Sequence, residues 1–158
     1  MKKIQKSGFI FYVDTEKTTK YYSSNSSCRC YSCRNLSMQI ETLSSNLIAF
    51  LAEFGIDARY PDESSDIVND KQIDYLFVGY TVVGHIETEG SYEADIDGYH
   101  ITISHGDTPY DWFPNEQTEP CFFVSVSGIS LPWILDEPLP QRPRLFDKIK
   151  YLFMKKKN

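Results

Sequence analysis

A stripe of apolar residues in the first third of the chain constrains the fold most strongly. Its members recur at intervals of three and four, the spacing that places side chains on one face of an α-helix: Leu36, Ile40, Leu43, Leu47, Phe50, Leu51 and Phe54. Gly55 follows, and glycine readily adopts the left-handed conformation that commonly ends a helix. The spacing predicts a helix over residues 33–54 that must bury its apolar face against a second layer.

The second layer is predicted to be an antiparallel sheet, because the other apolar runs have the features of strands. They are rich in β-branched and aromatic residues or alternate apolar with polar positions. The runs cover residues 8–13, 73–87, 91–96, 99–104 and 121–131. Asp97-Gly98 separates the third run from the fourth and is a strong signal for a two-residue hairpin turn. A short helix is expected over residues 15–22, after Asp14 as its N-cap.

Helices early in the chain, followed by strands, are typical of an α+β fold. We expect an antiparallel meander of about four to five strands with the long helix on one face. Residues 1–141 are predicted to form a single domain, and residues 142–158 a basic amphipathic helix. This tail is interpreted as a helix that docks on the domain; contact with an anionic membrane surface is the alternative.

Charge is distributed unevenly along the 158 residues, whose net charge is −6. Residues 57–113 carry thirteen acidic residues against Arg59 and Lys71, whereas residues 142–158 carry seven basic residues against Asp147. An acidic body would repel phosphate, so nucleic acid is not an expected partner. The acidic surface could bind a basic protein, and the simpler interpretation is a solvated surface that serves solubility.

Apolar runs in this sequence are too short to span a membrane, and the N-terminal one is too short for the core of a signal peptide. We therefore expect a cytoplasmic protein. Thiols stay reduced in the cytosol, which argues against a disulfide framework although the cysteines are even in number.

Three of the four cysteines, Cys28, Cys30 and Cys33, fall within six residues. Zinc prefers four ligands, and its cysteine ligands often come in pairs two to four residues apart. The cluster supplies three ligands at such spacing, and Cys121 is the candidate for the fourth. The three histidines are further candidates for this position: His85, His100 and His105. The spacing predicts a zinc site with three cysteine ligands from the cluster and a fourth ligand from Cys121 or one of these histidines.

Two other interpretations of the cluster remain open. Cys33 is expected near a helix N-terminus, where the helix dipole lowers a thiol pKa, and Arg29 and Arg34 add positive charge. The pair Cys30 and Cys33 could then do redox chemistry, although no βαβ pattern surrounds it. Alternatively, all three are ordinary reduced thiols packed where a loop meets a helix.

Several segments together resemble a family of small uncharacterised bacterial proteins. The segments are FYVDTEKTTKYY, CRCYSCRN, FLAEFGIDARYPDE and SLPWILDEP, which cover residues 8–63 in part and the LPW segment at 131–133. The resemblance implies that Cys28, Cys30, Cys33 and Asn35 are characteristic positions, and it implies no reaction. The chain departs from the pattern at Tyr60, between Arg59 and Pro61.

Other candidate sites are weaker. His100, His105 and Asp107 could ligate a metal or transfer protons, but His100 also belongs to the polar face of a hairpin. Tyr110, Trp112 and Phe113 are predicted to lie in a loop, where exposed aromatic residues suit partner binding and could equally cover the core. Phosphate-binding glycine loops and hydrolase or metalloprotease motifs are absent from the sequence.

Two functions follow from these observations. The first is a non-enzymatic accessory protein, such as a toxin-neutralising immunity protein, that binds a basic partner through its acidic surface. The alternative is a zinc- or thiol-dependent protein that uses the cysteine cluster. Enzymatic activity is left undecided, with a non-enzymatic role preferred.

Overall fold

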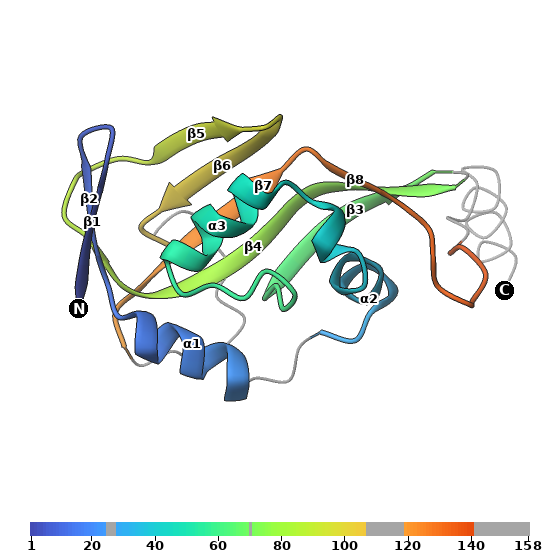
Figure 1. Ribbon diagram of the computed structural model, residues 1–158, viewed down its shortest axis with the longest axis horizontal. Coiled ribbons are helices and arrows are strands. Elements are labelled where there is room, and N and C mark those ends of the chain that lie inside the picture. Colours follow the sequence, from blue (N-terminus) through green and yellow to red (C-terminus); the bar gives the residue numbers. More distant parts are fainter. Residues whose placement is uncertain (25–27, 70, 107–118, 141–158) are drawn as a thin grey trace, which may run out of the picture.

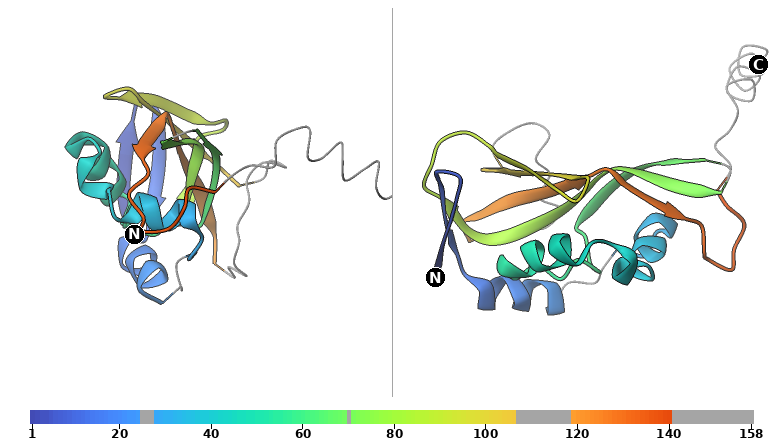
Figure 2. Two further views of the ribbon diagram at one scale, coloured as in Figure 1. Left: turned by 90° about the vertical axis from the view of Figure 1, so that its right-hand side faces the viewer. Right: turned by 45° about the horizontal axis from the view of Figure 1, so that its top comes forward.

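The computed structural model describes residues 1–24, 28–69, 71–106 and 119–140. They form an antiparallel sheet with helices on one of its faces (Figures 1 and 2). The helical elements are α1 (Thr15–Ser24), α2 (Tyr31–Ser37), η1 (Ile40–Thr42) and α3 (Ser45–Glu53). The strands are β1 (Lys2–Lys6), β2 (Phe9–Val13), β3 (Glu63–Val68), β4 (Gln72–Ile86), β5 (Tyr92–Ile96), β6 (Tyr99–Ser104), β7 (Cys121–Ser127) and β8 (Ile129–Pro132).

The α+β class and the antiparallel pairing are as predicted, but the strand number and the meander are wrong. The sheet has eight strands in the order β1-β2-β4-β7-β6-β5, with β3 and β8 also paired to β4. β4 therefore lies between β2 and β7, which are not its neighbours in the sequence, whereas a meander would pair only consecutive strands. The sequence pattern missed β1 and β3, and the predicted strand over 121–131 is two strands separated at Gly128, where φ is +86°.

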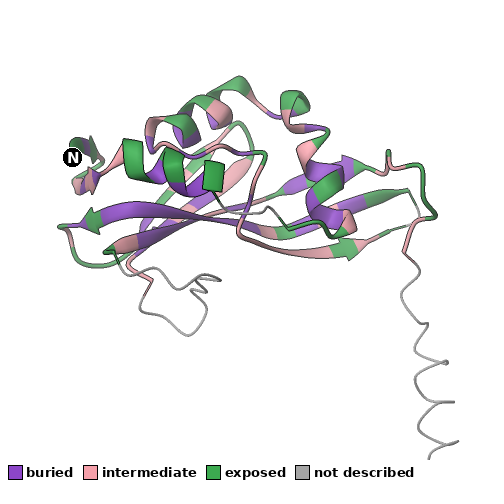
Figure 3. Cartoon of the chain, turned by 90° about the horizontal axis from the view of Figure 1, so that it is seen from below, coloured by how far each residue is buried: buried purple, intermediate pink, exposed green. Residues whose placement is uncertain are grey.

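β4 is the central strand and pairs along both edges. On one edge it pairs first with β8 and then with β7; on the other it pairs first with β3 and then with β2. Its residues Ile73, Tyr75, Val78, Tyr80 and Val82 lie in the core beneath the helices. Buried residues accordingly follow the strands and the sheet-facing sides of the helices (Figure 3).

Side chains complete the hydrogen bonding of β4 between β3 and β2, where no strand pairs with that edge in the described part of the chain. The Thr81 N–H donates to Asp62 Oδ2 at 2.7 Å, and the Thr81 carbonyl accepts from the Tyr22 hydroxyl at 2.8 Å. The Val83 N–H donates to Thr18 Oγ1 at 3.1 Å. Because unpaired buried backbone groups are costly, the bonds made by Tyr22 and Thr18 fix α1 against the edge.

The predicted helix over residues 33–54 is wrong in its continuity and right in its buried face. The segment is divided into α2, η1 and α3, because Ser44 caps α3 by accepting from the N–H groups of Asn46 at 3.1 Å and Leu47 at 3.4 Å. A residue in this role has non-helical backbone angles, which interrupts the helix. Leu36, Leu43 and Phe50 are nevertheless buried in the core.

Other predictions for local structure are confirmed. The helix expected over residues 15–22 is α1, and the Asp97-Gly98 turn joins β5 to β6 with positive φ at both positions. The predicted tail helix, residues 142–158, lies outside the described residues, and the single-domain boundary stays a prediction. No helix among the described residues is long and apolar enough to cross a membrane.

The role of Thr18 in completing β4 can be tested with Thr18→Val. Valine keeps the shape of threonine but leaves the buried Val83 N–H without its acceptor. We expect the free energy of unfolding to fall by about 1–3 kcal/mol in denaturant titrations. Thr19→Val on the exposed side of α1 is the matched control, expected to change stability by less than about 0.5 kcal/mol. Equal losses in the two variants would contradict the account.

Candidate functional site

The three clustered cysteines converge where the chain enters α2. The Sγ atoms of Cys28, Cys30 and Cys33 all lie within 4.8 Å of one another. Cys28 and Cys30 are exposed, whereas Cys33 is buried, and all four cysteines of the chain are free thiols. The prediction that the three sulfurs come together is therefore met by the geometry.

The start of α2 brings these sulfurs together. Cys30 is the N-cap, and its Sγ accepts a hydrogen bond from the Cys33 N–H at 3.5 Å. Its carbonyl accepts from the Arg34 N–H at 3.1 Å, which closes the first turn. The cap thus fixes two of the three sulfurs relative to each other, while Cys28 approaches from the preceding segment.

Hydrogen bonds to the sheet hold α2 in place. The Tyr75 hydroxyl on β4 donates to the Ser32 carbonyl at 2.7 Å, and Cys33 Sγ lies 3.7 Å from Ser64 Oγ on β3. Asn35 Nδ2 donates to the Pro132 carbonyl at 3.1 Å. The sulfur cluster is therefore attached to the strands at the β3–β8 end of the sheet.

Asn35 connects two segments that lie far apart in the sequence. Its Oδ1 accepts from the Ile134 N–H at 3.1 Å, while Nδ2 binds the Pro132 carbonyl. Gln39 Nε2 donates to that carbonyl at 2.9 Å. The Cys-x-x-Cys-x-Asn motif and the Leu-Pro-Trp segment are thus joined by direct hydrogen bonds.

Cys121 is not brought to the cluster. It lies at the start of β7 opposite Val83, whereas Ser64, which contacts Cys33, lies opposite Val78. The five residues from Val78 to Val83 span about 16 Å along β4. The group of sulfurs close enough to share a metal ion contains the other three cysteines and not Cys121.

The histidines considered as a fourth ligand also have other neighbours. His85 stacks on Tyr12 with ring centroids 4.9 Å apart, His100 Nδ1 lies 3.1 Å from Asp95 Oδ1, and His105 Nε2 lies 2.9 Å from the Thr88 carbonyl. Asp107 and the loop residues Tyr110, Trp112 and Phe113 lie outside the described residues. All cysteines and histidines of the sequence are described, so a fourth such ligand is not at hand within the chain.

The thiols differ in pKa in a way that the sequence did not predict. Burial raises the pKa of Cys33 well above its ordinary value, which is opposite to the lowering expected from a helix N-terminus. A hydrogen bond from the Cys30 backbone lowers the pKa of Cys28. In the metal-free protein, the exposed Cys28 is thus the more reactive of these two thiols.

A cavity of about 220 Å³ lies beside the sulfurs. Cys28 and Cys33 line it together with Arg29, Arg34 and Arg59. The contribution of Arg59 was missed at the sequence level, because it follows the helical region and reaches the site only through the fold. The available signal was that Arg29, Arg34 and Arg59 all precede a long stretch, residues 72–141, that has no lysine or arginine.

Comparison with protein-family models, curated proteins and solved structures gives no match. The chemistry of the site is therefore the basis for inferring a function. Three sulfurs within 4.8 Å of one another need only a small movement of their side chains to surround one ion at the Zn–S distance of about 2.3 Å. They can also act as separate thiols, of which Cys33 is shielded from solvent.

The pKa difference predicts the order of thiol alkylation in the metal-free protein. At a pH below the ordinary thiol pKa, a lowered pKa raises the thiolate fraction of Cys28, whereas a raised pKa reduces that of Cys33. Iodoacetamide should label Cys28 before Cys33, as followed by peptide mass spectrometry. Denatured protein is the control, in which the two should react at similar rates. Faster labelling of Cys33 in the folded protein would refute this order.

Proposed function

We propose that this protein binds one zinc ion through Cys28, Cys30 and Cys33. The observation that carries the proposal is the convergence of three sulfur atoms within 4.8 Å on a segment held to the sheet. The free cysteines and the hydrogen-bonded α2 cap support a preformed arrangement for two of the ligands.

Zinc is the metal that suits these ligands best among common divalent ions. Thiolates are soft ligands, which favour zinc or copper(I) over magnesium and calcium. Metal binding requires deprotonated cysteines, and a divalent ion compensates the cost of ionising the buried Cys33. The metal would thus stabilise a thiolate that the metal-free fold disfavours.

The role we propose for zinc is to fix the segment before α2 against the helix. Cys28 lies outside α2, while Cys30 caps it and Cys33 lies within its first turn. A metal shared by the three would cross-link this segment to the helix. Because binding energy of this kind is folding energy, metal should raise the stability of the protein.

Cys30→Ser tests the proposal without removing the helix cap. Serine is a preferred N-cap residue, so the metal-free variant should keep its stability to within about 1 kcal/mol. Zinc affinity should fall by more than the roughly 10–100-fold that follows loss of an outer-shell partner of a metal ligand. Competition with a chromophoric chelator measures the affinity, and metal analysis should give one zinc per wild-type chain.

Cys121→Ser is the matched control, because Cys121 lies apart from the cluster. It should keep wild-type zinc affinity and stoichiometry. Loss of zinc in Cys121→Ser, or undiminished binding in Cys30→Ser, would exclude the three-sulfur site. Absence of zinc binding by the wild-type protein would exclude the function.

A second candidate function is binding of a basic protein, including the toxin-neutralising role considered above. The observation that favours it is an exposed acidic edge at β5, the last strand of the sheet order. Glu87, Glu89, Glu93, Asp95 and Asp97 are exposed there, and residues 72–141 contain no lysine or arginine. Hydrogen bonds from Ser44 and Asn46 lower the pKa of Asp97, which keeps it ionised.

Charge reversal tests this second candidate. Glu93→Lys should slow association with a basic partner recovered by pull-down and reduce the salt dependence of binding. Glu41→Lys, an exposed substitution on η1 away from β5, changes the net charge equally and is the control. A pull-down that returns no protein, or equal loss of binding in both variants, would argue against the acidic edge as a binding surface.

A further inference from the structure

The cavity beside the sulfurs is lined by arginines, which have no part in binding zinc through three sulfur atoms. All three arginines among the described residues, Arg29, Arg34 and Arg59, line this one cavity. Acidic residues do not occur among the described residues that line it, although the chain has 22 acidic residues against 16 basic ones. The concentration of guanidinium groups here runs against the charge of the whole molecule.

Two of these arginines are held by carboxylates that do not line the cavity. Arg34 Nη2 lies 2.5 Å from Glu137 Oε1, and Arg34 Nε donates to the Arg29 carbonyl at 3.1 Å. Arg59 binds Asp57 through Nε at 2.9 Å and Nη2 at 2.5 Å. These contacts use two of the three nitrogens in each guanidinium, and Nη1 remains for a further acceptor.

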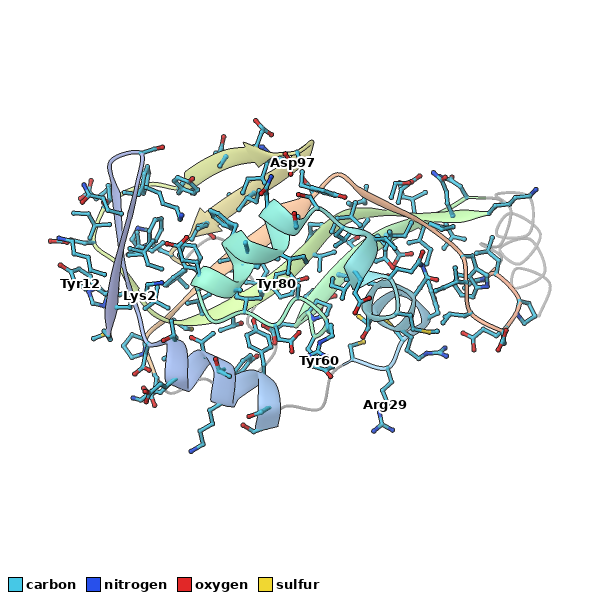
Figure 4. All side chains as sticks on the ribbon, viewed as in Figure 1. Lys2, Tyr12, Arg29, Tyr60, Tyr80 and Asp97 are labelled. Atoms are coloured by element: carbon cyan, nitrogen blue, oxygen red, sulfur yellow. The ribbon has the colours of Figure 1, made fainter. Side chains whose placement is uncertain are left out.

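Arg29 differs from the other two. Its side chain extends away from the fold in Figure 4, while its carbonyl helps to hold Arg34. The anion-binding capacity of the cavity therefore rests on Arg34 and Arg59, which come from α2 and from the segment after α3. Met38 and Leu135 provide apolar wall.

Metal coordination leaves a position to be filled at the same place. Zinc takes four ligands, and the cluster provides three sulfurs. The remaining cysteine and the three histidines of the sequence lie beside other groups. A zinc site with three protein ligands ordinarily carries water or a bound molecule in the fourth position.

From these observations, and resting on the zinc site proposed above, we propose that the cavity binds a small oxyanion that supplies the fourth ligand to the metal. One oxygen of a carboxylate or phosphate group would coordinate zinc, and the others would accept hydrogen bonds from Arg34 and Arg59. No covalent bond of the anion is broken in this proposal. The ligand is a small molecule, in keeping with a cavity of about 220 Å³.

The charges are consistent with this ligand class. One zinc ion and three thiolates carry a net charge of −1, so an added anion needs positive neighbours. Arg34 and Arg59 keep charged N–H donors at Nη1 although each is also paired with a carboxylate, and their planar donors match the oxygens of carboxylate and phosphate.

Cobalt(II) replacement of zinc tests the proposal in the full-length protein. The sulfur-to-cobalt charge-transfer band reports thiolate coordination, and the d–d bands report the number and type of ligands. Inorganic phosphate and malonate are the probes, added separately to the cobalt-loaded protein. We expect saturable changes in the d–d bands with at least one probe while the charge-transfer band persists. Which probe binds more tightly distinguishes phosphate from carboxylate as the preferred group.

Arginine substitutions identify the residues that hold the anion. Arg34→Gln and Arg59→Gln should each weaken binding of the preferred probe by about tenfold, as expected for loss of a hydrogen bond from a charged donor. Lys20→Gln on α1 removes the same charge from an exposed position outside the cavity and should leave the affinity unchanged. Circular dichroism of each variant checks the fold, and Arg59→Gln tests the proposal if Arg34→Gln does not fold.

The outcomes separate this proposal from the metal site itself. Absence of the charge-transfer band would refute the metal site and with it the anion proposal. A normal charge-transfer band with d–d bands that neither probe changes would refute the anion proposal alone. A four-sulfur spectrum accompanied by dimerisation would also refute the anion proposal alone. Equal weakening of probe binding by Lys20→Gln and Arg59→Gln would do so too.

Discussion

The two-edged pairing of β4 is the constraint on which the rest of the structure depends. This fifteen-residue strand must satisfy backbone groups along both edges, and no single partner is long enough to do so. Four strands share the task with side chains of Asp62, Thr18 and Tyr22 and with backbone groups outside the strands. Each of these partners is thereby positioned along the length of β4.

The candidate site depends on the first half of that strand. Tyr75 on β4 binds α2 through the Ser32 carbonyl, and β3, paired to the same stretch, presents Ser64 to Cys33. β8 ends in Pro132, whose carbonyl holds Asn35. The sulfur cluster therefore lies at the start of a short helix that contacts three strands, and a rigid support of this kind favours a defined ligand geometry.

Patterns in the sequence predicted the features of the fold that depend on neighbouring residues. The apolar spacing of Leu36, Leu43 and Phe50 identified a buried face correctly, because a helical stripe of apolar side chains is stabilised by burial whichever strands cover it. It could not reveal the break before α3, since Ser44 lies between apolar positions that continue the same stripe. β3 was missed because its sequence, Glu-Ser-Ser-Asp-Ile-Val, lacks apolar alternation and pairs as a strand only alongside β4.

The site shows the same division between local and long-range information. The spacing of Cys28, Cys30 and Cys33 was enough to predict that their sulfurs meet, because a capped helix start joins them. The distance to Cys121 is set by strand register, which no local pattern contains. Arg59 reaches the same cavity through the packing of the segment after α3, so the basic surroundings of the sulfurs emerged only with the fold.

X-ray absorption spectroscopy of the zinc-loaded protein tests the central claim most directly, because it counts the atoms bonded to the metal. The account predicts three sulfur atoms at about 2.3 Å and one oxygen atom at about 2.0 Å. A shell of oxygen and nitrogen alone would show that the metal binds elsewhere, and a shell of four sulfurs would show that the fourth position is not open to an anion. Either result would contradict the account.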